Sequence, residues 1–227
     1  MVPVEIPPYV LLLPGIWQDS NIYLVRSEDE ALLIDTGTGM FIGQYLPFLM
    51  ERLSGVERLT ILNTHEHYDH TGGNLRMKAA LEKRGITVRF AAHELTAEAI
   101  EKANDRIILA FHYGRSFEPH AVEVKFTGGE GLRVGSLSFE VLHTPGHTRG
   151  SIMLYDREEK LLFTGDTIFE GTIGRVDFPT GSLGEMLGTL NRLLDLDVDL
   201  GLPGHGKVIL NWDENLRKVL KLTEGLL

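Results

Sequence analysis

One stretch of the 227-residue sequence places four potential metal ligands within six positions: Asn63-Thr64-His65-Glu66-His67-Tyr68-Asp69-His70. It follows the apolar run 59–62, which is typical of a strand, and it precedes a helical pattern. Because His65 and His67 are two residues apart, both rings project to the same side of an extended chain. Imidazoles combined with a carboxylate suit zinc or a similar first-row ion. The stretch therefore predicts a metal site at the end of a strand.

Two later histidines occur in a similar context. His147 stands in a Pro-Gly-His turn after the predicted strand 137–142, and His205 stands in another after the predicted strand 199–202. Glycine in such a turn lets the backbone approach a ligand closely. Asp166 ends a further apolar run and, taken alone, is equally well explained as a turn former. Together with the first stretch, these residues supply five histidines and two aspartates, enough for two metals that share a carboxylate.

The remaining histidines lack this context, and we expect structural roles for them: His93, His112, His120 and His143. A single histidine is more often a surface residue or a hydrogen-bonded core residue than a ligand.

Composition narrows the classes of function. With 22 basic and 32 acidic residues the net charge is −10, which disfavours nucleic-acid and anionic-membrane partners. The absence of cysteine excludes disulfides, thiolate ligands and a cysteine nucleophile. The apolar runs are too short to span a bilayer, and the first residues carry an acid and prolines instead of a basic signal-peptide region. We therefore expect a cytoplasmic protein.

Apolar runs and turn residues predict strands and helices in alternation, with no linker between halves. The predicted strands are 10–13, 22–25, 31–34, 59–62 and 87–91 in the first half, and 122–126, 132–134, 137–142, 152–155, 161–164 and 199–202 in the second. The predicted helices are 40–53, 75–84, 94–110, 183–194 and 212–226. This order predicts an α/β protein with two sheets face to face and helices outside, in a single domain over residues 1–227.

The ligand pattern resembles the metallo-β-lactamase superfamily. The family motif His-x-His-x-Asp-His corresponds to residues 65–70, and its later His, bridging Asp and final His correspond in order to His147, Asp166 and His205. The segment 33–37 also looks like the family's early strand-turn signature. The resemblance implies a four-layer αβ/βα sandwich of two mixed sheets, with the metals at one edge.

The same resemblance implies a role for each ligand. One ion would take His65, His67 and His147, and the other Asp69, His70 and His205, with Asp166 bridging them. Asp35 would orient the ligand loop without binding metal. The implied cofactors are two divalent ions, with zinc expected and iron or manganese as alternatives.

The region after Asp166 resembles the glyoxalase II-like branch, whose members hydrolyse thioesters such as hydroxyacylglutathione. The resemblance rests on Gly174-Arg175-Val176-Asp177. Arg175 would either bind a substrate carboxylate or pair with Asp177 as a structural clamp. The sequence departs from full-length glyoxalase II in ending soon after His205, so the helical region that contacts glutathione is absent or reduced.

The implied reaction is attack of a metal-bridging hydroxide on the acyl carbon of a small acyl or thiol-derived substrate. Asp69 would orient the hydroxide and shuttle its proton. Tyr68 would either donate to the oxyanion or serve in packing. The segment 96–119 would pass near the site as a substrate lid or as an oligomer contact.

Two other reactions fit the same residues. An iron-dependent persulfide dioxygenase would use one metal, with ligands equivalent to His65, His147 and Asp166. A lactonase or another small ester hydrolase would need the same two metals and a different pocket. A flavodiiron-type oxidoreductase is disfavoured because it has Glu where His67 stands.

Overall fold

The computed structural model describes residues 2–6 and 8–226. Seven strands form the first sheet in the order β1-β2-β3-β4-β5-β6-β7. Their bounds are β1 (Val4–Ile6), β2 (Val10–Leu13), β3 (Ile22–Ser27), β4 (Glu30–Ile34), β5 (Arg58–Leu62), β6 (Thr87–His93) and β7 (Val124–Phe126). The pairs from β1 to β4 are antiparallel and those from β4 to β7 are parallel, so the sheet is mixed.

The second sheet has the order β14-β11-β10-β9-β8, and only its β11–β14 pair is parallel. Its strands are β8 (Gly131–Val134), β9 (Leu137–His143), β10 (Ile152–Asp156), β11 (Leu161–Gly165) and β14 (Leu200–Pro203). A small hairpin of β12 (Ile168–Phe169) and β13 (Thr172–Ile173) follows β11.

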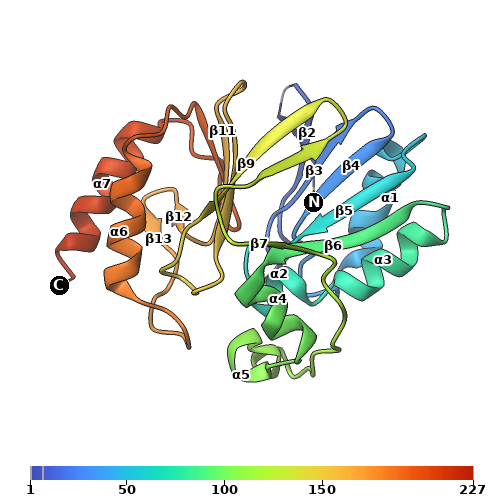
Figure 1. Cartoon of the computed structure of the whole chain (residues 1–227), viewed down its shortest axis with the longest axis horizontal. Coiled ribbons are helices and arrows are strands. Elements are labelled where there is room, and N and C mark those ends of the chain that lie inside the picture. Colours follow the sequence, from blue (N-terminus) through green and yellow to red (C-terminus); the bar gives the residue numbers. More distant parts are fainter. Residues whose placement is uncertain (1, 7, 227) are drawn as a thin grey trace.

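Helices cover the outer face of each sheet (Figure 1). The helices that the structure describes are α1 (Ile42–Arg52), α2 (Tyr68–Thr71), α3 (Asn74–Glu82), α4 (Glu94–Glu101), α5 (Asp105–Ile108), the 3₁₀ helix η1 (Ala110–Tyr113), α6 (Leu183–Leu193) and α7 (Trp212–Glu224). Helices α1 and α3 lie outside the first sheet, and α6 and α7 lie outside the second (Figure 1). The predicted four-layer αβ/βα sandwich of two mixed sheets is therefore confirmed.

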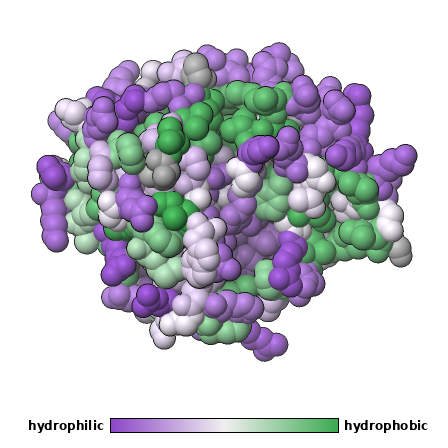
Figure 2. All heavy atoms as spheres, turned by 180° about the vertical axis from the view of Figure 1, so that it is seen from behind, coloured by the Kyte–Doolittle hydropathy of each residue, from purple (hydrophilic) through white to green (hydrophobic). Residues whose placement is uncertain are grey.

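Side chains that alternate between the two faces of each strand explain why helices pack on one face of a sheet and the other sheet packs on the opposite face. In β4, Leu33 packs toward the helices of its own sheet, whereas Leu32 and Ile34 pack into the core between the sheets. Because successive side chains point to opposite faces, a strand that is covered on both sides reads as a continuous apolar run. On the outer surface, hydrophilic residues cover most of the outline of the rear face, with hydrophobic residues in smaller groups between them (Figure 2). Within the described residues, every helix is too short or too polar to cross a membrane.

The structure corrects two sequence-based expectations. The strand predicted at 122–126 was assigned to the second half, but β7 pairs in parallel with β6 in the first sheet. The helix predicted over 94–110 is wrong beyond Glu101. Ala103 and Leu109 adopt left-handed backbone conformations, with φ of 47° and 66°, and these divide the segment into α4, α5 and η1.

The loops after β4, β5, β9, β11 and β14 meet at one edge of the sandwich. Backbone hydrogen bonds hold them there: Gly204 N donates to Gly165 O at 2.8 Å, and Ile152 N donates to Thr64 O at 2.9 Å. The second of these bonds joins the loop after β5 to the opposite sheet. The residues singled out from the sequence occupy these loops.

Candidate metal centre

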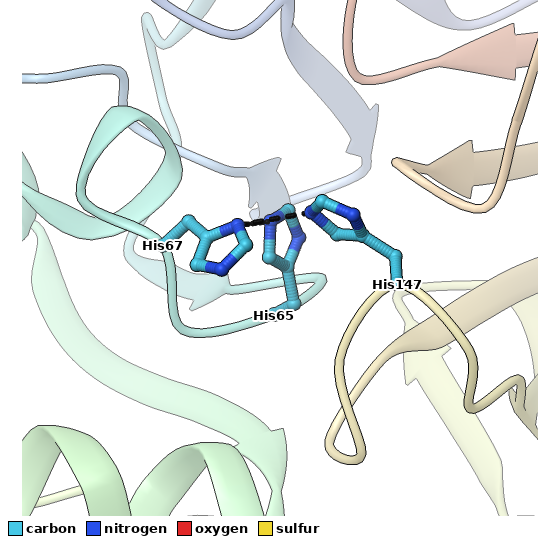
Figure 3. A group of neighbouring side chains, drawn as sticks. All are labelled: His65, His67 and His147. Atoms are coloured by element: carbon cyan, nitrogen blue, oxygen red, sulfur yellow. Dashed lines mark hydrogen bonds between the residues drawn. The ribbon is translucent and has the colours of Figure 1, made fainter. Parts of the chain in front are cut away.

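Three imidazoles point toward one another at this edge (Figure 3). His67 Nδ1 lies 3.1 Å from His65 Nε2 and 2.9 Å from His147 Nε2, as the dashed lines in Figure 3 mark. Nitrogen ligands at about 2.0–2.1 Å in a tetrahedral zinc site lie about 3.3 Å from one another. The three nitrogen atoms therefore have nearly the spacing of a metal-bound triad.

A second group of donors lies beside the first. His205 Nε2 is 3.1 Å from Asp69 Oδ2 and 3.2 Å from His70 Nε2. Each group offers one ligand atom per residue, and within each group these atoms lie within 4.8 Å of one another. The chain thus brings together two sets of three donors that are far apart in the sequence.

Asp166 stands between the two sets. Its Oδ2 lies 3.7 Å from His147 Nε2 in the first set and 3.6 Å from His205 Nε2 in the second. Its Oδ1 lies 3.3 Å from His70 Nε2. A single carboxylate within reach of both sets has the position that a ligand shared by two cations requires.

The charge and burial of these groups fit a cation site. Among the described residues, Asp166 Oδ1 is buried and makes no hydrogen bond of good geometry, although His70 Nε2 lies 3.3 Å away, and a buried carboxylate oxygen of this kind favours a nearby positive charge. Burial lowers the pKa of His67 to about 3, and burial with neighbouring histidines holds the pKa of His65 well below its usual range. Neutral imidazoles keep the free lone pair that a metal ligand needs.

The second set carries the negative charge. Burial acts to lower the pKa of His70, but the carboxylates of Asp166, Asp35 and Asp69 raise it well above its usual range. The same balance of burial against carboxylates raises the pKa of His205. Three acidic groups gathered around the imidazoles therefore give the site an affinity for positive charge.

Two acceptors outside the donor sets fix the ring orientations. Asp35 accepts hydrogen bonds from Thr64 N at 2.9 Å, Thr64 Oγ1 at 2.8 Å and His70 Nδ1 at 2.7 Å. His147 Nδ1 donates to Arg175 O at 2.6 Å. With Nδ1 occupied, the Nε2 atom of each ring faces the site, which is how outer partners orient metal-binding histidines.

A cavity of about 460 Å³ opens onto the donors. His67, Asp69, His147, Asp166 and His205 all contribute to its lining. That volume lies within the range of about 300–1,000 Å³ typical of small-molecule sites.

The structure shows the contacts of Tyr68 and of Arg175. Tyr68 is buried in a small apolar cluster, its ring 5.3 Å from that of Tyr113, and it is not among the residues that line the cavity. Arg175 donates to both carboxylate oxygens of Asp177, at 2.9 and 2.7 Å, and its guanidinium lies 4.0 Å from the ring centre of Phe178. Both side chains thus make structural contacts, and Arg175 also lines the cavity.

The segment 96–119 does reach the cavity, through Leu109, His112 and Tyr113. His112 was grouped with the structural histidines, and its place in a segment expected near the site was the signal against that grouping. Sequence reasoning also missed Trp17, whose large exposed side chain lines the cavity from the loop before β3.

The other histidines make structural contacts. His93 accepts a hydrogen bond from Leu95 N at the start of α4, and its ring stacks on His143 at 4.2 Å. His120 interacts with Asn74 through Nε2.

Comparison with known proteins agrees with this geometry. The profile described as Metallo-beta-lactamase superfamily matches residues 15–205. An acyl-coenzyme A thioesterase, MBLAC2 from Bos taurus, is 31% identical over 215 residues, covering 82% of this chain and 72% of the relative. Hydroxyacylglutathione hydrolase GloC from Haemophilus influenzae is 34% identical over 155 residues, covering 64% of this chain and 68% of the relative. The crystal structure of TTHA1623 in a di-iron-bound form has a TM-score of 0.70 at 30% identity, covering 94% of this chain and 96% of the other.

Proposed function

The chain belongs to the metallo-beta-lactamase superfamily and is a homologue of its hydrolases, and from this premise we propose that it is a binuclear metal-dependent hydrolase that cleaves thioesters such as a hydroxyacylglutathione. The observation that carries the proposal is the position of Asp166 within 3.7 Å of a histidine from each donor set. A thioesterase and a hydroxyacylglutathione hydrolase among the relatives support the substrate class. Both halves of the chain contribute to the core between the sheets, which supports one domain over residues 1–227.

The proposed ligands follow the two sets. His65, His67 and His147 would hold one ion, and Asp69, His70 and His205 the other, with Asp166 contacting both. We take zinc as the expected metal, since imidazole and carboxylate donors suit it, with iron as the alternative. When bound, such a pair of ions supplies a water of lowered pKa and a Lewis acid for the acyl oxygen.

Side chains of the protein would orient the attacking water and exclude bulk solvent. The Asp69 side chain is 17% exposed and faces the cavity, whereas Asp35 is 2% exposed and holds His70. Asp69 can therefore accept a hydrogen bond from the attacking water, orient it and take up its proton. Tyr113 also lines the cavity, so its ring would help to exclude bulk water.

The test combines metal analysis with turnover. We expect protein purified without added metal, then reconstituted, to hold two divalent ions per chain and to hydrolyse lactoylglutathione or an acyl-coenzyme A, followed by loss of thioester absorbance. Asp166→Ala should lose metal and lower kcat/KM by at least about a hundredfold. Asp213→Ala, which removes an exposed carboxylate on α7, is the matched control.

Full turnover by Asp166→Ala would refute the proposed site. A single iron per chain, with oxygen uptake on glutathione persulfide and no thioester cleavage, would instead assign the dioxygenase reaction.

A further inference from the structure

Apolar side chains from separate segments wall the cavity beside the donors. Trp17 comes from the loop before β3, Leu109 from between α5 and η1, and Phe169 and Ile173 from the β12–β13 hairpin, while Phe178 follows that hairpin. Burial of an apolar group against such a wall gains about 25 cal/mol per Å². The wall therefore favours a ligand with an apolar portion.

Apolar rings flank the donors at both ends. The ring of Phe178 lies 5.6 Å from that of His67, and the ring of Phe169 lies 6.2 Å from that of His205. A reacting acyl carbon placed between the two donor sets would thus have an aromatic ring on either side. The groups that extend from that carbon toward either ring therefore meet apolar surface.

Charge on the lining does not favour an anionic substrate arm. Among the described lining residues, Arg175 is the one permanently charged cation, and both of its hydrogen-bonding contacts go to Asp177. Asp177 already offsets the charge of Arg175, so a carboxylate on the substrate would meet a paired guanidinium and would have only the N–H groups that Asp177 leaves free. The cavity therefore offers little gain for the charged ends of a thiol carrier such as glutathione.

Two wall residues hold uncommon backbone conformations. Trp17 has φ of 59° and Leu109 has φ of 66°, a region that bulky residues rarely adopt. Conformations of this kind persist where the surroundings impose them, and they are frequent at ligand-binding sites. Trp17 is also 68% exposed, so burial in the folded chain does not account for a large apolar side chain at this position.

We propose that the preferred substrates are thioesters with an apolar, uncharged acyl group, and that Trp17 forms part of the surface that receives this group. This inference rests on the proposed thioester hydrolysis and specifies its substrate class. Selectivity would come from the length of the acyl group, with the identity of the thiol arm as a minor factor.

The experiment uses metal-reconstituted enzyme and a series of thioesters. Acetyl, butyryl and hexanoyl thioesters of N-acetylcysteamine, which is uncharged, are compared with the same acyl groups on glutathione. We expect kcat/KM to rise about fourfold per added methylene, since each buried methylene contributes that factor. Exchanging the thiol arm should change kcat/KM by less than tenfold.

Variants of Trp17 test whether the apolar wall causes the dependence of kcat/KM on acyl length. Trp17→Ala should reduce the increase per methylene to about twofold or less, and Trp17→Phe should restore most of it. Leu210→Ala is the matched control, because Leu210 is 71% exposed and lies outside the cavity lining.

The outcomes separate this inference from the reaction itself. If no thioester is hydrolysed, the proposed reaction fails. If thioesters are hydrolysed but kcat/KM stays flat with acyl length, or the glutathione arm raises it more than tenfold, the substrate class is wrong. If the length dependence is present and unchanged in Trp17→Ala, the role given to Trp17 is refuted.

Discussion

Replacing Gly204 by alanine should disable the metal centre without unfolding the protein. A Cβ at this position would lie 2.8 Å from His70 Cε1 and closer still to Asp166 Oδ1. The backbone has no room to retreat, because Gly204 N donates to Gly165 O at 2.8 Å and Asn21 N donates to Gly204 O at 2.6 Å. The side chains must therefore give way.

The distance by which the Asp166 carboxylate must move determines the expected loss of activity. A carbon and an oxygen approach to about 3.3 Å, so the Asp166 carboxylate must move by about 1 Å. Metal-ligand distances are held within about 0.2 Å, so this shift removes the shared ligand from at least one ion. A misplacement of about 1 Å costs about a hundredfold in rate.

The assay measures metal per chain after dialysis into metal-free buffer, together with kcat/KM on an accepted thioester. We expect Gly204→Ala to keep at most one ion and to lose at least about a hundredfold in kcat/KM. Gly188→Ala in α6 is the control, since a Cβ there meets nothing within 4 Å and the change should be neutral or slightly stabilising. Two tightly held ions and wild-type turnover in Gly204→Ala would refute the argument that a shared carboxylate holds the site together.

Two further predictions concern groups outside the ligand sets. Asp35→Ala removes the acceptor of His70 Nδ1, so equilibrium dialysis should show metal affinity lowered by about 10- to 100-fold; unchanged affinity would mean that packing alone orients His70. Hydrogen bonds from Thr127 and nearby backbone amides lower the pKa of Glu130 from 4.5 to about 2. Because the folded-state pKa is the lower one, this stabilisation is present above pH 4.5 and is lost as the pH falls toward 2. Glu130→Gln should therefore lower the Tm at pH 7 and differ little from wild type near pH 2, and an equal Tm difference at both values would contradict the assignment.

The positions of the candidate ligands could be predicted because each one follows a strand. A strand is recognisable from its apolar run, and the first polar residues beyond it must lie at a sheet edge. The ends of five strands carry the candidate donors and Asp35. The sequence therefore indicated which side chains would come together once the two sheets were assembled. The bridging role proposed for Asp166 came from the family resemblance, since nothing in the neighbouring sequence distinguishes that residue from a turn former.

The breaks within 94–110 could not be predicted in the same way. Most residues there favour a helix and no proline or glycine interrupts them, so the one local signal was Asn104, a typical N-cap residue at the start of α5. The chain turns at Ala103 and Leu109 because tertiary packing places Ile108 and Ala110 in the cluster around Tyr68. Propensity is a weak signal, and such contacts override it.

The same contrast explains why the sequence indicates the centre more readily than its substrate. Ligands must have particular donor atoms, so histidine and aspartate at strand ends carry a strong signal. The apolar wall of a cavity needs only large apolar side chains, and many residue types supply these. In the sequence, Trp17, Leu109 and Phe178 therefore look like residues of the hydrophobic core, and only the folded structure places them in the lining of the cavity. Trp17 was absent from the sequence-based hypotheses, although its side chain is 68% exposed and its backbone is left-handed. An exposed aromatic residue in a sparsely populated backbone conformation can be recognised only in the folded protein, and here it lines the cavity beside the candidate metal ligands.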